Sequence, residues 1–287
     1  MQYRDEILAT INIAHHFESA FSREQIYSFL RVKLDYHTFK LHLDELINEN
    51  ILIEKNGMIF QKNLTDSHWN RKQWSKNIFR NHRKSLSILC MLPWIKFAGL
   101  TGANAFESCE KNDDIDLFFI TSKDRLWICY LLLVIFSKLI RKREVFCINY
   151  LVDEKNIEIK EKNYFTAVQL VQMIPLFATK IQKEIIKNNN WIFNFLPNAN
   201  GQININKFYL LKSHESSSNG KLYSSKFLSM INSKIYYKYS QRLAKKFPEA
   251  FGTGILLTEG AAKLNRLDHQ NIYNKLFDQI SPEKIAV

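Results

Sequence analysis

The sequence of 287 residues is short of cysteine, and its four cysteines are not arranged as metal ligands or disulfide partners. Successive cysteines lie about twenty residues apart, no C-x-x-C pair occurs, and no histidine stands at ligand spacing from them. This pattern argues against a structural zinc site and against a disulfide framework. The first ten residues, MQYRDEILAT, are charged and lack the apolar core of a signal peptide. We therefore expect a reduced, cytoplasmic protein.

Long hydrophobic runs are also missing. The segment that comes nearest to a membrane span is LWICYLLLVIF, from Leu126 to Phe136, and it ends at Ser137 and Lys138 after eleven residues. A membrane-spanning helix needs roughly twenty apolar residues. We therefore expect this segment to be a buried helix of a soluble domain, and we expect no membrane partner.

Apolar residues and positive charge are plentiful. Residues of the apolar class make up 46% of the chain, with 21 Phe and 12 Tyr, which is typical of a protein with a folded core. The 40 Lys and Arg exceed the 28 Asp and Glu, giving a net charge of +12. Two interpretations of this excess stay open: lysine-rich solvated faces, or a polyanionic ligand such as a nucleotide, a nucleic acid or a membrane surface. The length allows one to three domains.

The first 64 residues have the pattern of three helices and a β-hairpin. Apolar residues recur at helical spacing from Arg4 to Phe17, SREQ at Ser22 is a capping box, and Asp35 begins a third helix. ILIEKNGMIF then predicts two short strands around Asn56-Gly57, a type I′ turn signal. This order predicts a winged-helix-like domain over residues 1–64.

The third helix of this domain would be the one that reads DNA. It carries four acids against a lone Lys40, so it would repel phosphates. We therefore expect no DNA binding, and a protein-contact role is the alternative. Residues 65–92 form a basic helical connector. Its cations are either a solvated surface or a basic rim near an anionic substrate; they are Arg71, Lys72, Lys76, Arg80, Arg83 and Lys84.

The middle of the chain, residues 93–178, alternates strand and helix. We expect strands at Trp94–Leu100, Ile115–Thr121 and Glu144–Val152, a short helix at the Thr101-Gly102 turn, and longer helices at Leu126–Ile140 and Asn163–Phe177. We expect residues 179–287 to be mostly helical, with a long amphipathic helix around residues 227–243 and a last helix from His269 to Ile280. The chain as a whole is predicted to be an α+β or α/β multidomain protein.

The stretch GLTGANAFESCEKNDDIDLFFIT places two acids at the mouth of an apolar strand. Side chains alternate along a strand, so Asp114 and Asp116 project to one face while Ile115 enters the core. Two adjacent carboxylates repel each other, and burial raises the cost of ionising both. A divalent cation removes that cost, and Mg²⁺ combines a few carboxylates with the phosphate oxygens of a substrate. The pair therefore suits metal-assisted phosphoryl or nucleotidyl transfer.

The glycine turn before the aspartates suits a phosphate. Gly102 lets the backbone come close to a ligand, and a helix that begins there aims free amides at an anion. Thr101 and Asn104 can add polar contacts. We therefore predict that residues 101–104 seat the phosphates of a nucleotide.

These features together resemble the signature of polymerase-β-type nucleotidyltransferases, namely a strand, a Gly-Ser turn, a short helix and then Asp-hydrophobic-Asp. The resemblance covers Pro93 to Pro175, and its later segments are similar to a bacterial subgroup of that superfamily. Gly102 matches the glycine of the family, and Asp114 and Asp116 match its metal-binding aspartates. The resemblance implies transfer of a nucleoside monophosphate from a nucleoside triphosphate to an acceptor, with two Mg²⁺ ions and release of pyrophosphate.

The sequence departs from this family at two positions. Ala103 stands where the family has a serine that contacts the triphosphate, and Thr101 or Asn104 can take over that contact. The third acid of the family, often the general base, is expected on the strand CINYLVDE, where Asn149 and Asp153 are the candidates.

Three functions stay open at this point. The first is a nucleotidyltransferase acting on a small molecule, a protein or RNA. The second is an RNA- or tRNA-directed enzyme that uses the basic connector. The third is a catalytically degenerate, nucleotide-sensing winged-helix regulator, which Ala103 and Asn149 favour.

Overall fold

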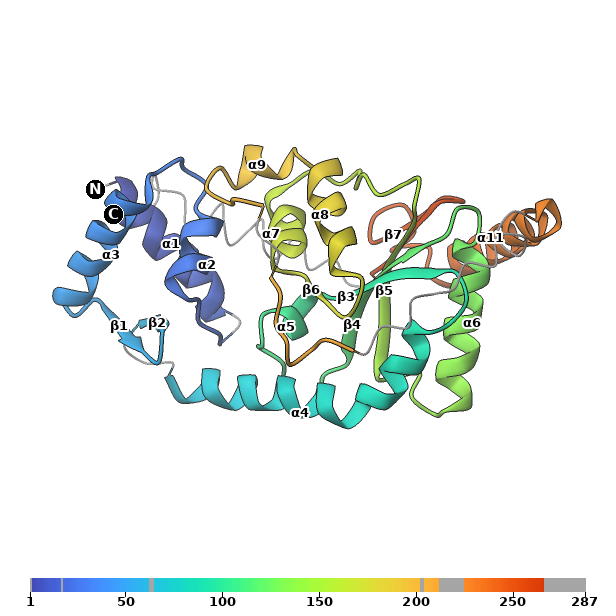
Figure 1. Ribbon diagram of the computed structural model, residues 1–287, viewed down its shortest axis with the longest axis horizontal. Helices are drawn as coiled ribbons and strands as arrows, with labels where there is room; N and C mark the ends of the chain where they lie inside the picture. Colours follow the sequence, from blue (N-terminus) through green and yellow to red (C-terminus); the bar gives the residue numbers. More distant parts are fainter. Residues whose placement is uncertain (1, 17, 62–64, 202–203, 212–224, 266–287) are drawn as a thin grey trace.

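The structure is a computed structural model that describes residues 2–16, 18–61, 65–201, 204–211 and 225–265 (Figure 1). Within these residues the protein is of the mixed α+β class, with one six-stranded sheet and a separate two-stranded hairpin. No helix in these ranges is long and apolar enough to cross a membrane. The last helix expected from the sequence, His269 to Ile280, lies outside the described residues.

Three helices and a hairpin form the N-terminal unit, in the order that the sequence predicts (Figure 1). Ser22 begins the second helix with a capping box, and Asp35 caps the third. Asn56 and Gly57 have positive φ angles of 53° and 74°, as a type I′ hairpin requires. The elements are α1 (Gln2–His16), α2 (Arg23–Phe29), α3 (Tyr36–Asn48), β1 (Leu52–Lys55) and β2 (Met58–Gln61).

The basic connector is a single helix, α4 (Thr65–Cys90), which runs along one side of the molecule from the hairpin to the central sheet (Figure 1). Several of its cations bind groups of the protein itself. Arg71 forms ion pairs with Glu18 and Glu110, and Arg83 donates two hydrogen bonds to backbone carbonyls of residues 204–211. These cations therefore hold neighbouring segments onto α4.

The central sheet has the strand order β6-β3-β4-β5-β8-β7. Only β4 and β5 run parallel, and every other neighbouring pair is antiparallel. The sequence predicts β3, β4 and β5 but misses the other three strands. The strand β6 follows a helix that ends earlier than expected. The strands β7 and β8 come from the C-terminal region, which the sequence predicts to be mostly helical. The strands are β3 (Ile95–Leu100), β4 (Ile115–Thr121), β5 (Phe146–Asp153), β6 (Ile174–Pro175), β7 (Ile255–Leu257) and β8 (Ala261–Leu264).

Helices cover both faces of this sheet (Figure 1): α6 (Leu126–Leu139), α7 (Tyr164–Gln172), α8 (Thr179–Asn188), α9 (Ile192–Phe195) and α11 (Lys226–Lys246). Alternate residues of β4 enter two separate cores. Leu117 and Phe119 pack with residues of α4 and α6, whereas Phe118 and Ile120 pack with residues of α7, α8 and the N-terminal helices. Burying each such side chain contributes roughly 1.5–3 kcal/mol. The middle of β4 is therefore apolar on both faces, and its polar residues, Asp116 and Thr121, stand near its two ends.

The long helix α11 packs against α6 at one end of the molecule (Figure 1). Asn232 caps the start of α6, because its Oδ1 accepts hydrogen bonds from the backbone amides of Trp127 and Ile128, at 2.8 and 3.3 Å. The predicted amphipathic pattern holds from Ile231 onwards. The pattern also places Phe227 on the apolar face, but the structure leaves this side chain 64% exposed.

Candidate metal centre

The two aspartates lie where the sequence predicts, at the start of the central strand β4. Asp114 immediately precedes β4 and Asp116 is its second residue, with Ile115 between them fully buried in the core. Both carboxylates are half-buried. The alternation of the strand thus directs Asp116 away from the core that Ile115 enters.

Cys147 joins the aspartates from the neighbouring parallel strand. It pairs in register with Asp116, and paired residues of adjacent strands point to the same face. One ligand atom from each of Asp114, Asp116 and Cys147 lies within 4.8 Å of the other two. Two ligands of one tetrahedral cation are about 3.3–3.8 Å apart, because each bond is about 2.0–2.3 Å long. Small side-chain adjustments would therefore let all three bind a single cation.

Asn149 occupies a β-bulge beside Asp116. Leu117 pairs with Ile148 and Phe118 pairs with Tyr150, so Asn149 is an extra residue in β5. Its Nδ2 donates a hydrogen bond to Asp116 Oδ1, and its Oδ1 accepts one from the thiol of Cys147. The sequence predicts this residue as part of the site, and the structure brings it there, as the group that orients Asp116.

Asp153, the other candidate for the third acid, is not in the site. It pairs with Thr121 at the far end of β4, five positions from Asp116, or about 16 Å along the strand. The expectation that Asp153 shares the face of Asn149 assumes unbroken alternation. The bulge at Asn149 breaks it, so Asp153 lies on the opposite face from Asp116 and accepts hydrogen bonds from the turn that follows β5.

Gly102 is fitted closely against Asp116. It begins the one-turn helix α5 (Gly102–Ala105) with a positive φ of 54°, which favours glycine. A Cβ at this position would overlap Asp116 Oδ2 and lie 2.9 Å from Asp116 Cγ. The backbone amide of Gly102 donates to Gln169 Oε1 at 3.0 Å, so this group is already satisfied within the protein.

The other residues predicted to seat a triphosphate differ in their accessibility. Thr101 and Ala103 are half-buried, whereas Asn104 is only 3% exposed. Asn104 Nδ2 donates a hydrogen bond to the backbone carbonyl of Asp114 at 2.9 Å. Asn104 therefore positions the first aspartate, and the prediction that it contacts phosphate is not supported by its surroundings.

The electrostatics of the site favour a bound cation. Burial, and after it the charge of Asp114, raise the pKa of Asp116 to about 7, against the lowering effect of the hydrogen bond from Asn149. Burial also raises the pKa of Asp114. The thiol of Cys147 has a pKa of about 12, raised by burial and by the nearby aspartates. A divalent cation would offset the cost of holding these carboxylates ionised.

Arg143 is a site residue that sequence reasoning missed. It lies in the turn before β5, where it donates to the backbone carbonyl of Phe146 at 3.0 Å. Its charge lowers the pKa of both Asp114 and Cys147, which places it close to the metal centre. The sequence signal is the basic run RKR that ends at this position, just before a predicted strand.

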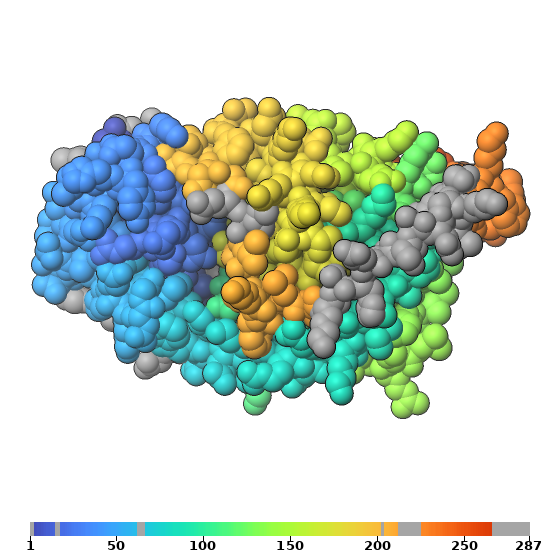
Figure 2. All heavy atoms as spheres, viewed as in Figure 1, coloured from blue at the N-terminus to red at the C-terminus, as the bar shows by residue number. Residues whose placement is uncertain are grey.

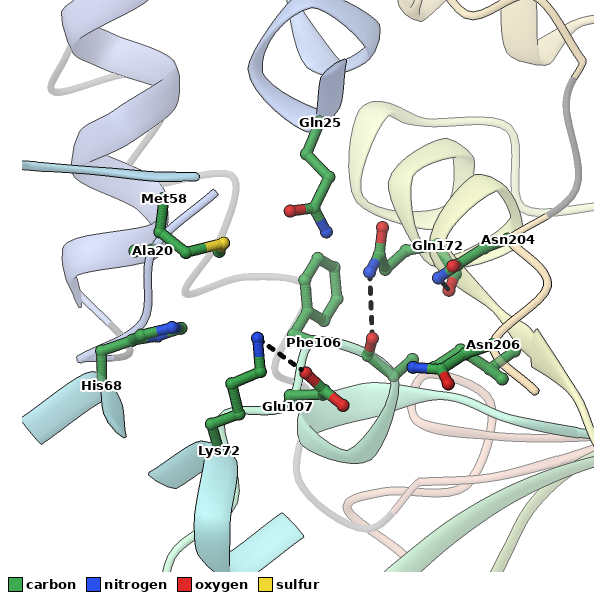
Figure 3. A pocket seen from close by; sticks show the side chains of 12 residues that line it. Ala20, Gln25, Met58, His68, Lys72, Phe106, Glu107, Gln172, Asn204 and Asn206 are labelled. Carbon is green, nitrogen blue, oxygen red and sulfur yellow. Dashed lines mark hydrogen bonds and ion pairs between the residues drawn. The ribbon is translucent and has the colours of Figure 1, made fainter. Parts of the chain in front are cut away.

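A separate polar cavity of about 170 Å³ lies between the N-terminal unit and helices α4, α5 and α7. Gln25, Phe106 and Gln172 point toward it in Figure 3, and Lys72 forms an ion pair with Glu107 at its edge. Neither aspartate of the metal centre lines it. The cavity is therefore distinct from the candidate metal centre. The short helix α5 lies between the two, because Ala105 lines the cavity and Gly102 contacts Asp116.

No family model, curated protein or solved structure matches the chain.

Proposed function

We propose that the protein is a metal-dependent nucleotidyltransferase, which moves a nucleoside monophosphate from a nucleoside triphosphate to an acceptor and releases pyrophosphate. The observation that supports this most is the convergence of Asp114, Asp116 and Cys147 beside the Gly102 turn. In this proposal residues 1–64 are a winged-helix-like domain, residues 65–92 a connector, and the central sheet the catalytic domain. The C-terminal region completes that sheet with β7 and β8.

The donor set fits a divalent cation. The carboxylates of Asp114 and Asp116 would hold it, and Mg²⁺ is the ion that favours such oxygen ligands together with phosphate oxygens. When bound, the ion supplies positive charge to the phosphates. The thiol of Cys147 is not a usual ligand of Mg²⁺. The protein therefore offers Mg²⁺ two ligands, the carboxylates, and would offer a softer metal three, the carboxylates and the thiolate.

The other residues of the site have separate roles. Asn149 fixes the carboxylate of Asp116, and Gly102 leaves room for that carboxylate against the backbone. Arg143 contributes a positive charge for the triphosphate. An oxygen of the acceptor attacks the α-phosphorus, the bond from that phosphorus to the bridging oxygen breaks, and pyrophosphate leaves. Because Asn149 cannot take a proton, the acceptor proton passes to water.

Labelling of a cell extract tests this proposal. The purified protein is incubated with Mg²⁺, an extract and each α-labelled nucleoside triphosphate in turn, and labelled products are separated. We expect a labelled acceptor with the wild type and none with Asp116→Asn. Asp153→Asn is the matched control, because Asp153 lies on the other face of the sheet, and it should label normally. Undiminished labelling by Asp116→Asn would refute the assignment.

A nucleotide-sensing regulator without catalysis is the second candidate. Three features favour a regulator. Ala103 replaces the serine of the family, and Asn149 stands where a third acid is expected. The backbone amide of Gly102 is already bonded to Gln169, so it is not free to bind a phosphate. This candidate predicts saturable binding of a nucleoside triphosphate without pyrophosphate release. A DNA-binding version also predicts an affinity that falls steeply with salt, which a gel-shift titration would measure.

A further inference from the structure

Helix α11 concentrates positive charge that the structure does not use internally. It has six basic residues and no acid, and all six are exposed. None of the six forms an ion pair with any residue that the structure describes. The cations of α4 differ in this respect, because Arg71 forms an ion pair with a glutamate and Arg83 donates to a backbone carbonyl. The basic residues of α11 are Lys226, Lys234, Lys238, Arg242, Lys245 and Lys246.

Four of these cations form one stripe along the helix. Lys234, Lys238, Arg242 and Lys245 follow one another at spacings of four, four and three residues, which places neighbours on the same helix face. The stripe is about 16 Å long, since each residue advances a helix by 1.5 Å. A row of unpaired cations of this length fits a polyanion with regularly spaced charges better than a single small phosphate ligand.

Exposed aromatic side chains accompany the stripe. Phe227 lies two helical turns before Lys234 on the same face and is 64% exposed, and Tyr237 is 63% exposed. Cations combined with exposed aromatic rings are the usual surface for single-stranded nucleic acid, because bases stack on the rings. The opposite face of α11 is packed on α6, where Asn232 accepts a hydrogen bond from the backbone amide of Trp127 and the ring of Tyr236 lies against that of Trp127. Because this packed face cannot insert into a lipid surface, a membrane explains the cations of α11 less well than a nucleic acid does.

Helix α11, although not the stripe itself, makes contacts with α6 that lead toward the candidate metal centre. The hydroxyl of Tyr239 in α11 lies 3.0 Å from that of Tyr130 in α6. Tyr130 also interacts with Arg143, whose charge lowers the pKa of Asp114. Side-chain contacts from α11 through α6 thus lead to Arg143, the cation proposed to serve the triphosphate. Figure 2 shows α11 at one edge of the molecule, where it stands out from the body.

We infer that α11 is a binding surface for single-stranded RNA, through its basic stripe and its exposed aromatic rings. This inference rests on the proposed function, because it makes RNA the acceptor class of the nucleotidyltransferase. It also moves the RNA contact from the connector α4, where the sequence suggested it, to α11.

Fluorescence anisotropy with a labelled, mixed-sequence RNA of about 16 nucleotides, the upper end of common site sizes, tests this inference. The test variant is Lys234→Glu/Lys238→Glu/Arg242→Glu. The matched control is Lys180→Glu/Lys183→Glu/Lys187→Glu, which makes the same charge change on exposed residues of α8. We expect at least tenfold weaker binding for the α11 variant and less than threefold for the control.

The salt dependence gives an independent readout. Between about 50 and about 200 mM KCl, the slope of log affinity against log salt should become shallower by about 2 in the α11 variant, because each lost phosphate contact contributes about 0.7 for a single strand. Phe227→Ala/Tyr237→Ala should weaken binding with little change in slope. Equal losses in the α8 control, or equally tight binding of DNA of the same sequence, would overturn the inference. Binding to vesicles of phosphatidylcholine and phosphatidylserine but not to RNA would overturn it as well.

The Asp116→Asn variant separates the two proposals. It should bind RNA as tightly as the wild type, because Asp116 lies outside the α11 surface. If RNA binds but no label is transferred, the nucleotidyltransferase assignment fails and the RNA surface stands. If label is transferred to a small molecule or a protein and RNA does not bind, the inference about α11 fails alone.

Discussion

Gly102 and Asp116 are in such close contact that the glycine has no room for a side chain. A Cβ would overlap Asp116 Oδ2, and the φ of 54° is itself unfavourable for other residues. Gly102→Ala should therefore displace the carboxylate and lower the free energy of unfolding. Gly57→Ala is the matched control, because Gly57 has a φ of 74° and open space around it.

Chemical denaturation of both variants measures this effect. We expect Gly57→Ala to cost about 1–2 kcal/mol, the usual cost of a left-handed backbone conformation. Gly102→Ala should cost at least as much and should also weaken divalent-cation binding. Normal cation binding by Gly102→Ala would show that the carboxylate position does not depend on this contact.

Cys147 is expected to set the metal preference of the site. Replacing it with aspartate places a third carboxylate in register with Asp116, which suits Mg²⁺ better than a thiol. Cys147→Asp should bind Mg²⁺ about tenfold more tightly by calorimetry, or about 1.4 kcal/mol. Cys147→Ser, which has no charge, should not. With Co²⁺, the wild type should show a thiolate-to-metal absorption band that Cys147→Ser lacks.

The pH dependence of stability should reveal the perturbed aspartate. Asp116 has a pKa of about 7 in the folded protein against an ordinary value of 3.8, so the folded state holds its proton more strongly. The stabilisation that comes from holding this proton is complete below about pH 4 and is lost as the pH rises through about 7. Without metal, Asp116→Asn should be more stable than the wild type at pH 8, by roughly 1–3 kcal/mol.

Thermal unfolding in a chelator at a series of pH values checks this sign. The stability advantage of Asp116→Asn should be nearly constant above about pH 7 and should shrink steadily as the pH falls from about 7 to about 4. Adding Mg²⁺ should stabilise only the wild type at pH 8, because the ion binds the ionised carboxylate. An advantage that is constant with pH would contradict a raised pKa for this group.

Arg143 should contribute to nucleotide binding. Its position near Asp114 places a positive charge where the triphosphate is proposed to lie. Arg143→Ala should weaken binding of a nucleoside triphosphate by about tenfold, a typical loss for a hydrogen bond to a charged group. Arg141→Ala is the control, since Arg141 is exposed in the same turn. Equal affinity of the two variants in a calorimetric titration would remove Arg143 from the site.

The central strands and the aspartates could be predicted because their pattern is local. The apolar run after Asp116 defines β4, and the glycine turn before it defines the entry to the site. The third ligand position could not be placed, because the bulge at Asn149 interrupts the two-residue period on which the prediction relied. Sequence alternation pointed to Asn149 and Asp153. Asn149 does lie beside Asp116, whereas Asp153 does not, and the residue in register with Asp116 is Cys147.

Two other features depend on partners that are distant in the sequence. The strands β6 and β7 have only two and three residues, too few to show alternation, and they form because they pair with an edge of the sheet. The cations of α4 likewise looked available for an anion. Arg71 is in fact held by Glu18, 53 positions away, and this pairing carries no local signal.

The most direct test of nucleotidyl transfer compares two positions of the label on one nucleoside triphosphate. The α-phosphate is transferred in this reaction, and the γ-phosphate leaves in pyrophosphate. With Mg²⁺ and a cell extract, the wild-type protein should fix the α-label on an acceptor and should not fix the γ-label, and Asp116→Asn should fix neither. Transfer of the γ-label, or transfer of the α-label that survives Asp116→Asn, would contradict the account.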